Sequence, residues 1–204
     1  MTSMDWQARY IAGDTPWDEG AAHPALVDYI TARGPFTGHI LVPGCGAGHD
    51  VRAISTRDNT VLGLDIAPAA IAKAQALPPA AREQYLAGDF FNIDPELRAS
   101  FDWLVEHTCF CAIDPTMRPA YAVAAADALK PGAHCFAIFY LNPAVERRPP
   151  YGVTVAELDR LFSPFFTTVR EWTPERAYPD REGRELIRVM RRLERPEGPR
   201  RELQ

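Results

Sequence analysis

Residues Leu41–Asp50 read LVPGCGAGHD, in which an apolar run and a proline lead into three glycines spaced two apart, Gly44, Gly46 and Gly48. A glycine in the interior of a regular element costs about 0.5–1 kcal/mol relative to alanine. A cluster of glycines in one turn therefore indicates that a ligand comes close to the backbone there. The elements on either side of the turn indicate which kind of ligand it is.

The surrounding sequence predicts alternating strands and helices. His39–Val42 is a short apolar strand that enters the turn, and His49–Arg57 follows it as a helix. Further strands are expected at Val61–Asp65, Gln84–Ala87, Asp102–Val105, Cys135–Leu141, Phe166–Trp172 and Leu186–Leu193. Further helices are expected at Asp5–Ile11, Pro24–Arg33, Pro68–Leu77, Pro115–Leu129 and Val155–Leu161. This alternation predicts an α/β fold with a doubly wound, mostly parallel sheet of seven strands.

Two local signals refine this prediction. Asp114 precedes Pro115, an arrangement typical of an N-cap followed by proline at the first helical position. The glycine and proline of KPGAH, Lys130–His134, are expected to stop the helix that starts at Pro115. The last two strands are close in sequence, and we expect them to pair antiparallel at one edge of the sheet.

The composition limits the class of protein. The chain has 204 residues, of which 47% are hydrophobic and 24% charged, which is ordinary for a single globular domain. Its formal net charge is −5, and its basic residues are scattered apart from those at the C-terminal end, which argues against a nucleic-acid partner. No apolar run approaches the roughly 18 residues of a membrane span, and the start, MTSMDWQARY, lacks a signal-peptide pattern. We therefore expect a cytoplasmic protein without membrane or nucleic-acid partners, and the sequence leaves its oligomeric state open.

We expect residues 1–195 to form one domain, with residues 1–34 as an N-terminal helical lid and residues 196–204 as a disordered tail. The four cysteines are Cys45, Cys109, Cys111 and Cys135. Cys109 and Cys111 stand two apart, but the sequence has no Cys-x-x-Cys, no second cysteine pair and no histidines at the spacing of metal ligands. Reduced thiols and no metal are therefore expected.

The ends of the strands indicate the ligand. In such a sheet, ligands bind outside the carboxyl ends of the strands, where the winding reverses direction. Three residues after Gly46 stands His49, so the G-x-G-x-x-G spacing of nicotinamide dinucleotide sites is not met. Asp65 ends the second strand, where a carboxylate can accept two hydrogen bonds from ribose hydroxyls. Asp89 and Phe90 follow the third strand and offer an acceptor and an aromatic face to an adenine. Together these signals favour a ligand with adenosine and a small carboxylate rather than a pyrophosphate.

That description matches S-adenosylmethionine, and the chain resembles the class I methyltransferases, within them the thiopurine and thiol/halide methyltransferase family. The resemblance rests on LVPGCGAG, in which Val42 stands where most class I enzymes have an acidic residue, a departure that this family shares. Further similar motifs are GDTPWD, GLDIAPAAI, GDFF, EHTCFCAIDPTMRPAYA and PPYGV, in family order from about Trp6 to Arg192. The resemblance implies a Rossmann-like class I methyltransferase fold.

It also implies which residues contact the cofactor, namely Trp17, Gly44, Cys45, Gly46, Asp65, Ile66, Asp89, Phe90 and Glu106. Trp17 would close over the sulfonium, and the backbone of residues 44–46 would flank the methionyl group. Asp65 would hold the ribose, and Ile66 would lie beside the adenine. The alternative for Trp17 is a hydrophobic anchor.

On the acceptor side, the resemblance implies that Arg118 attracts an anionic nucleophile and that His107 lies near the substrate. Tyr10, Tyr140 and Tyr151 are expected to line the acceptor pocket. The alternatives are a solvated helix arginine for Arg118 and core or rim positions for the tyrosines. No catalytic general base is assigned from the sequence, because a thiolate or halide is already charged and transfer then depends on positioning and desolvation.

The expected function is transfer of a methyl group from S-adenosylmethionine to a small nucleophile, most simply a thiol, by in-line displacement. A halide, a thiopurine, a reduced selenium or tellurium species, or an oxygen or nitrogen nucleophile are alternative acceptors. A non-catalytic adenosylmethionine-binding regulatory module is an alternative from another class, and a nicotinamide-dependent oxidoreductase is a third.

Overall fold

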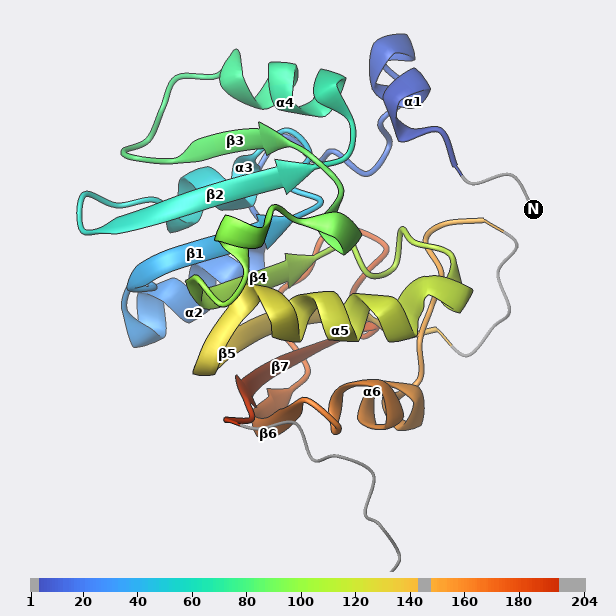
Figure 1. Cartoon of the computed structure of the whole chain (residues 1–204). Helices are drawn as coiled ribbons and strands as arrows, with labels where there is room; N and C mark the ends of the chain where they lie inside the picture. The colour runs from blue at the N-terminus through green and yellow to red at the C-terminus, as the bar shows by residue number, and fades with distance from the viewer. Residues whose placement is uncertain (1–3, 143–147, 195–204) are drawn as a thin grey trace, which may run out of the picture.

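The described residues, 4–142 and 148–194, form one seven-stranded sheet in the computed structural model of the protein (Figure 1). The strands are β1 (Gly38–Pro43), β2 (Asn59–Asp65), β3 (Gln84–Ala87), β4 (Phe101–His107), β5 (Leu129–Tyr140), β6 (Phe166–Trp172) and β7 (Glu185–Arg192). Their order across the sheet is β3-β2-β1-β4-β5-β7-β6. Strands β1 to β5 pair in parallel, whereas β7 pairs antiparallel with both β5 and β6. The predicted α/β fold is confirmed, including the antiparallel pair at one edge.

The strand order reverses between β1 and β4. Strands β2 and β3 extend the sheet on one side of β1, and β4 and β5 extend it on the other. In doubly wound sheets, ligands bind outside the carboxyl ends of the strands at such a point. The glycine turn after β1 therefore lies where a ligand site is expected.

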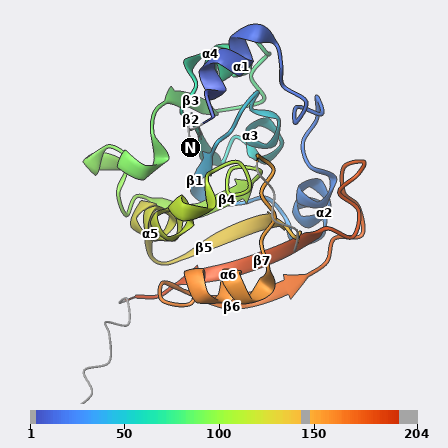
Figure 2. The same cartoon turned by 90° about the vertical axis from the view of Figure 1, so that its right-hand side faces the viewer.

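Helices cover both faces of the sheet. They are α1 (Trp6–Ala12), α2 (Pro24–Arg33), α3 (His49–Ile54), α4 (Pro68–Gln75), α5 (Arg118–Ala128) and α6 (Val155–Phe162), with short 3₁₀ turns at η1 (Phe90–Asn92), η2 (Pro95–Leu97) and η3 (Pro115–Met117). Buried side chains of α2 and α3, including Leu26 and Val51, form one core, and those of α5 and α6, including Tyr121 and Phe162, form the other. Figure 2 shows α2 and α5 on opposite sides of the sheet. Helix α1 lies beside α4, away from both cores (Figures 1 and 2).

Strand β5 separates the two cores. Cys135, Ala137 and Phe139 belong to the core under α5, whereas Phe136 and Ile138 belong to the opposite core. Successive side chains of a strand point to opposite faces, so a continuous apolar run fills both cores of a central strand.

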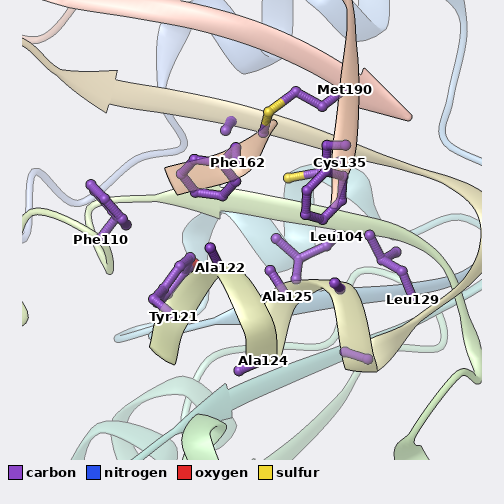
Figure 3. Close-up of a cluster of buried hydrophobic side chains, with 14 of the residues drawn as sticks. Leu104, Phe110, Tyr121, Ala122, Ala124, Ala125, Leu129, Cys135, Phe162 and Met190 are labelled. Carbon is purple, nitrogen blue, oxygen red and sulfur yellow. The ribbon is translucent and has the colours of Figure 1, made fainter. Parts of the chain in front are cut away.

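Small side chains let α5 pack closely on the sheet. Ala122 and Ala125 are fully buried and point toward the strands, near Leu104 and Cys135 (Figure 3). Tyr121, one position earlier, is also buried and carries its hydroxyl to the carboxyl end of β4. The helix thus contributes both to the core and to the end of the sheet at which a ligand is expected.

The helix predicted to stop at KPGAH does end there, but the strand predicted to begin at Cys135 begins six residues earlier. Helix α5 ends at Ala128, and strand β5 begins directly at Leu129. Between Phe101 and Trp103 of β4, the partner on β5 changes from Leu129 to His134, so Lys130–Ala133 form a bulge within the strand. Gly132 has a φ of 77°, which a bulge accommodates and a regular strand does not.

The other predicted elements are present with small shifts at their ends. The helix expected at His49–Arg57 ends at Ile54, because the Asn59 side chain provides the next hydrogen bonds: its amide donates to Ile54 O at 3.0 Å and its carbonyl accepts from the Thr56 N–H at 2.8 Å. No helix in the described parts of the chain is long and apolar enough to cross a membrane. The predicted tail, residues 196–204, lies outside the described residues.

Candidate active site

The turn between β1 and α3 is the centre of the candidate site. Gly44, Gly46 and Gly48 all have left-handed φ angles, of 61°, 54° and 75°. The Cys45 N–H donates to Leu64 O at 3.0 Å, and the Gly46 N–H donates to Asp65 Oδ2 at 2.9 Å. These two bonds fix the turn against the end of β2.

Packing separates the roles of the three glycines. A Cβ on Gly44 would lie 2.7 Å from the Cβ of Cys109, and one on Gly48 would lie 2.6 Å from the ring of Tyr85. A Cβ on Gly46 would lie 2.8 Å from the hydroxyl of Tyr10 in the N-terminal segment. The outer two glycines therefore serve the packing of the protein itself, and Gly46 faces the element that covers the turn.

Asp65 is buried at the carboxyl end of β2 and has a fixed orientation. Its Oδ1 accepts from the Ala67 N–H at 2.9 Å, and its Oδ2 accepts from the Gly46 N–H. Burial raises the pKa of this carboxyl, and the two backbone donors act against the rise. The next residue, Ile66, is 59% exposed although it is a large apolar side chain. A carboxylate and an exposed apolar side chain thus lie together at this strand end, and their contacts with a ribose and an adenine stay a prediction.

Helix α1 covers the turn. Gln7 Oε1 accepts from the Ala69 N–H of α4 at 2.9 Å, and the Trp17 indole N–H donates to the Tyr10 hydroxyl at 3.1 Å. The ring of Trp17 also packs edge-on against Trp6 at 5.2 Å. Burial, the largest influence, raises the pKa of Tyr10 to about 12, so its hydroxyl stays protonated at neutral pH.

The segment after α1 is held by charged contacts. Asp18, in GDTPWD, accepts from His49 Nε2 at 3.0 Å and pairs with Lys73 Nζ at 2.7 Å. These contacts join the N-terminal segment to the first turn of α3 and to α4. Among the described residues α1 buries none of its own side chains, so these polar contacts contribute to holding the cover in place.

Asp89 and Phe90, the residues predicted to contact the adenine after β3, differ in their exposure. Asp89 is exposed, and its Oδ1 accepts from the Phe91 N–H at 2.9 Å. Phe90 is only 6% exposed, and its ring lies 5.1 Å from that of Tyr121 in the core. The contact of this pair with an adenine stays a prediction.

Glu106, at the end of β4, is 1% exposed and braces the turn that follows. Its Oε1 accepts from the Phe110 N–H at 2.7 Å, and its Oε2 accepts from the Tyr121 hydroxyl. Burial raises the pKa of Glu106 to about 7, although both donors favour the charged form. Its predicted contact with the cofactor stays a prediction.

His107 follows Glu106 and pairs with Asp50 in the first turn of α3. Its Nδ1 donates to Asp50 Oδ2 at 2.7 Å, and Asp50 Oδ1 accepts from the His23 N–H at 2.8 Å. His107 Nε2 is buried and has no hydrogen-bond partner in the described part of the chain. Burial opposes the charged imidazole, but the charge and hydrogen bond of Asp50 outweigh it, and the pKa of His107 is raised.

A second imidazole lies beside His107. The rings of His23 and His107 are 4.6 Å apart, and Tyr178 packs on both, at 4.7 Å from His23 and 5.7 Å from His107. His23 Nε2 lies 2.9 Å from Glu185 Oε2 at the start of β7. Burial lowers the pKa of His23, with the hydrogen bond of Glu185 acting against it.

His23, His107 and Glu185 each place one possible metal-ligand atom within 4.8 Å of the others. The N–H of Ala25 donates to His23 Nδ1 at 3.2 Å, so the ring proton sits on Nε2 and points at Glu185. A metal bound to His23 Nε2 would displace this proton. A neutral ring would then carry its proton on Nδ1, where it would break the hydrogen bond that caps α2. The group therefore favours a hydrogen-bonded pair, and the expected absence of a metal stays a prediction.

Arg118 is 2% exposed, which excludes the solvated alternative. It donates from Nη1 to Glu157 Oε1 and from Nη2 to the carbonyls of Tyr151 and Gly152, each at 3.0 Å, and its guanidinium lies 5.1 Å from the ring of Phe110. The arginine thus joins α5, α6 and the segment before α6. Its predicted attraction of an anionic nucleophile stays a prediction.

The predicted tyrosines come from three different segments. Tyr140 ends β5 and is 9% exposed, with the guanidinium of Arg181 over its ring at 4.3 Å. The Tyr151 N–H donates to Cys111 O at 2.7 Å, which attaches its segment to the turn after β4. Tyr10 lies over Gly46. The predicted contact of the three tyrosines with an acceptor stays a prediction.

The sequence pointed to His107 but not to its partners Asp50, His23, Glu185 and Tyr178. The Asp50 and His107 pair is 57 residues apart, and His23 and Glu185 are 162 apart, so no local spacing could reveal them. One weak signal was present, because Asp50 stands in the first turn of the helix that follows the glycines.

Comparison with known proteins identifies the family. The family model described as thiopurine S-methyltransferase (TPMT) matches residues 1–194. The chain is 35% identical over 193 residues to the probable thiol methyltransferase 2 of Arabidopsis thaliana, covering 91% of this chain and 84% of that protein. It is 36% identical over 188 residues to the thiocyanate methyltransferase 1 of the same plant, covering 89% and 82%.

A solved structure confirms the fold. The Burkholderia thailandensis 1,6-didemethyltoxoflavin-N1-methyltransferase, solved with S-adenosylhomocysteine, is similar with a TM-score of 0.71 at 22% identity, covering 93% of this chain and 86% of that one. The chain therefore belongs to the thiopurine S-methyltransferase family, and it is an S-adenosylmethionine-dependent methyltransferase that acts on a small nucleophile.

Proposed function

We propose that the protein transfers the methyl group of S-adenosylmethionine to the sulfur of a small thiol by in-line displacement. The observation that carries the donor half is the fixed carboxylate of Asp65, hydrogen-bonded to Gly46 of the turn beside the exposed Ile66. The acceptor half is supported by the similarity to a relative named as a thiol methyltransferase.

The residues present fit the cofactor. Asp65 accepts one hydrogen bond on each oxygen from the backbone, which leaves lone pairs for two ribose hydroxyls. Ile66 offers an apolar surface to the adenine. The N–H groups at the turn and at the start of α3 favour the methionyl carboxylate. When bound, S-adenosylmethionine supplies a methyl carbon activated by a positively charged sulfur.

The protein contributes positioning and exclusion of water. Tyr10 lies over Gly46, and Trp17 donates a hydrogen bond to the Tyr10 hydroxyl. Both would lie next to the methionyl part, with their aromatic rings facing a positive charge. Holding a nucleophile at roughly 3–3.5 Å in line with the methyl carbon accounts for a large part of such a rate enhancement. Removing water from a thiolate raises its reactivity further.

Transfer to thiocyanate is the second candidate function. It is favoured by the 36% identity to a relative named as a thiocyanate methyltransferase. Thiocyanate is anionic at neutral pH and needs no base. The two candidates therefore differ in whether a proton must leave the acceptor.

The test is a methyl-transfer screen over small thiols, thiocyanate, halides and thiopurines, with release of S-adenosylhomocysteine as the readout. We expect a thiol to give the highest kcat/KM, and Asp65→Ala to lose this activity. Binding of S-adenosylhomocysteine without turnover of any acceptor would contradict the proposed function and favour a regulatory module.

We propose that residues 1–195 form a single domain whose N-terminal segment, residues 1–34, covers the turn through α1, whereas α2 packs in the core. We propose the cytoplasm as the compartment, since the four cysteines are free within the described residues. We propose that nucleic acids are not partners, in line with the net charge of −5.

A further inference from the structure

The Asp50–His107 pair contains a buried nitrogen that the fold leaves without a partner. His107 is 8% exposed, and its Nδ1 is held by Asp50 at 2.7 Å. Because an ionised carboxylate only accepts hydrogen bonds, the proton of the neutral ring sits on Nδ1 and Nε2 carries a lone pair. Nε2 has no partner among the residues that the structure describes. An unpaired buried polar atom costs about 1–3 kcal/mol, so such an atom calls for a ligand or a function.

An imidazole held at Nδ1 by a carboxylate, with an unpaired lone pair on Nε2, is the arrangement of a general base. His107 also lies at the carboxyl end of β4, next to the point where the strand order reverses. We propose that His107 is the general base that removes the proton from a thiol acceptor, with Asp50 as its positioning residue. This inference rests on the proposed function, because only an acceptor with a proton needs a base.

His107 Nε2 takes the proton of the thiol, so the S–H bond breaks, an N–H bond forms and the electron pair stays on sulfur. That pair forms the new S–C bond to the methyl carbon, while the bond from the methyl carbon to the donor sulfur breaks and leaves a neutral thioether. The imidazolium then returns its proton to water after the products leave.

The groups around His107 favour this role. It faces Asp50 of α3, Glu185 of β7 and its neighbour Glu106 of β4, and these carboxylates stabilise an imidazolium. The remaining groups against it are His23, before α2, and Tyr178, from the segment between β6 and β7.

The two imidazoles differ in how readily they take a proton. Asp50 raises the pKa of His107, whereas burial lowers the pKa of His23, whose Nε2 already donates to Glu185. Of the pair, His107 is therefore the one that accepts a proton near neutral pH. His23 offers a matched control, because it is also buried but has both nitrogens engaged.

Tyr178 packs against both rings, and because His107 Nε2 is buried, a thiol reaches it only when a neighbouring side chain moves. Its hydroxyl donates to Ala21 O at 2.6 Å. The nearby ion pair between Arg176 and Asp28 is exposed on both sides and therefore contributes little. The side chain of Tyr178 is thus held by few strong contacts.

The test compares two thiols from about pH 6 to about pH 10 in the wild-type enzyme, His107→Gln, Asp50→Asn and His23→Gln. One is an alkyl thiol with a pKa near that of cysteine, about 8.5, and the other is an electron-poor aryl thiol that is ionised at neutral pH. We expect His107→Gln to lower kcat/KM for the alkyl thiol by about 100-fold or more at pH 7. The loss should shrink as pH approaches the pKa of the thiol, and the aryl thiol should be nearly unaffected.

Asp50→Asn should move the acidic limb of the alkyl-thiol profile to lower pH, since the charge of Asp50 raises the pKa of His107. Any loss in His23→Gln should be the same for both thiols. Equal losses for both thiols in His107→Gln at all pH values would overturn the inference. If that variant does not fold, a wild-type profile with no acidic limb for the alkyl thiol would overturn it. A wild-type enzyme that methylates neither thiol would instead reject the proposed function.

Discussion

Replacing Asp65 by alanine tests the donor site. The carboxylate accepts two backbone hydrogen bonds at 2.9 Å, from Gly46 and Ala67, and would accept two more from ribose hydroxyls. A hydrogen bond to a charged group contributes about 1.5–3 kcal/mol. Losing the two ribose bonds alone therefore costs about 3 kcal/mol or more, which is about a hundredfold or more in Kd.

The assay is calorimetric titration of folded protein with S-adenosylhomocysteine, with circular dichroism as the check on folding. Asp65→Asn keeps the shape and one acceptor oxygen and should lose less affinity than Asp65→Ala. Asp58→Ala, at an exposed turn before β2, is the matched control and should bind like the wild type. Wild-type affinity in folded Asp65→Ala would refute the placement of the ribose.

Three further predictions concern stability. Gly48→Ala should destabilise the fold by about 1–3 kcal/mol more than Gly183→Ala in urea unfolding, because both positions have left-handed φ angles but only the first Cβ meets a ring, that of Tyr85. Equal losses of unfolding free energy in the two variants would show that the contact with Tyr85 does not matter and that the strain of the left-handed φ angle alone accounts for the loss. Glu106→Gln should flatten the pH dependence of the unfolding free energy between about pH 4.5 and pH 7. In the wild type the unfolded chain ionises Glu106 first, because its folded pKa is raised to about 7, so stability falls as pH rises through this window. A wild-type curve with no such fall would contradict the burial argument. Arg118→Met should lower the melting temperature and cost about 2–4 kcal/mol, because it removes the three hydrogen bonds that the buried Arg118 donates. A change within about 0.5 kcal/mol would contradict the structural role.

Much of the fold could be predicted because its signals are local. Helix α2 has the predicted bounds, Pro24–Arg33, since proline marks its first position and Gly34 follows its last. Strands β3 and β6 also have the predicted bounds. The bulge at Lys130–Ala133 was not predicted from the sequence. Proline and glycine occur both where a helix stops and in a bulge, so the local sequence does not separate the two.

The candidate site was predictable only where it follows the chain order of strand ends. Asp65 and the glycines stand at the carboxyl ends of adjacent strands, so the topology alone brings them together. The Asp50–His107 pair depends instead on how α3 packs against the end of β4. The burial of Arg118 depends on the docking of α6, which supplies Glu157. Such contacts join distant segments, and no single stretch of sequence encodes them.

A crystal structure of the protein with S-adenosylhomocysteine would show whether Asp65 binds the ribose. We expect both ribose hydroxyls within about 3 Å of the Asp65 carboxylate, the adenine against Ile66 and the amino-acid end over residues 44–46. Product bound elsewhere on the molecule, or a ribose that does not contact Asp65, would contradict this expectation.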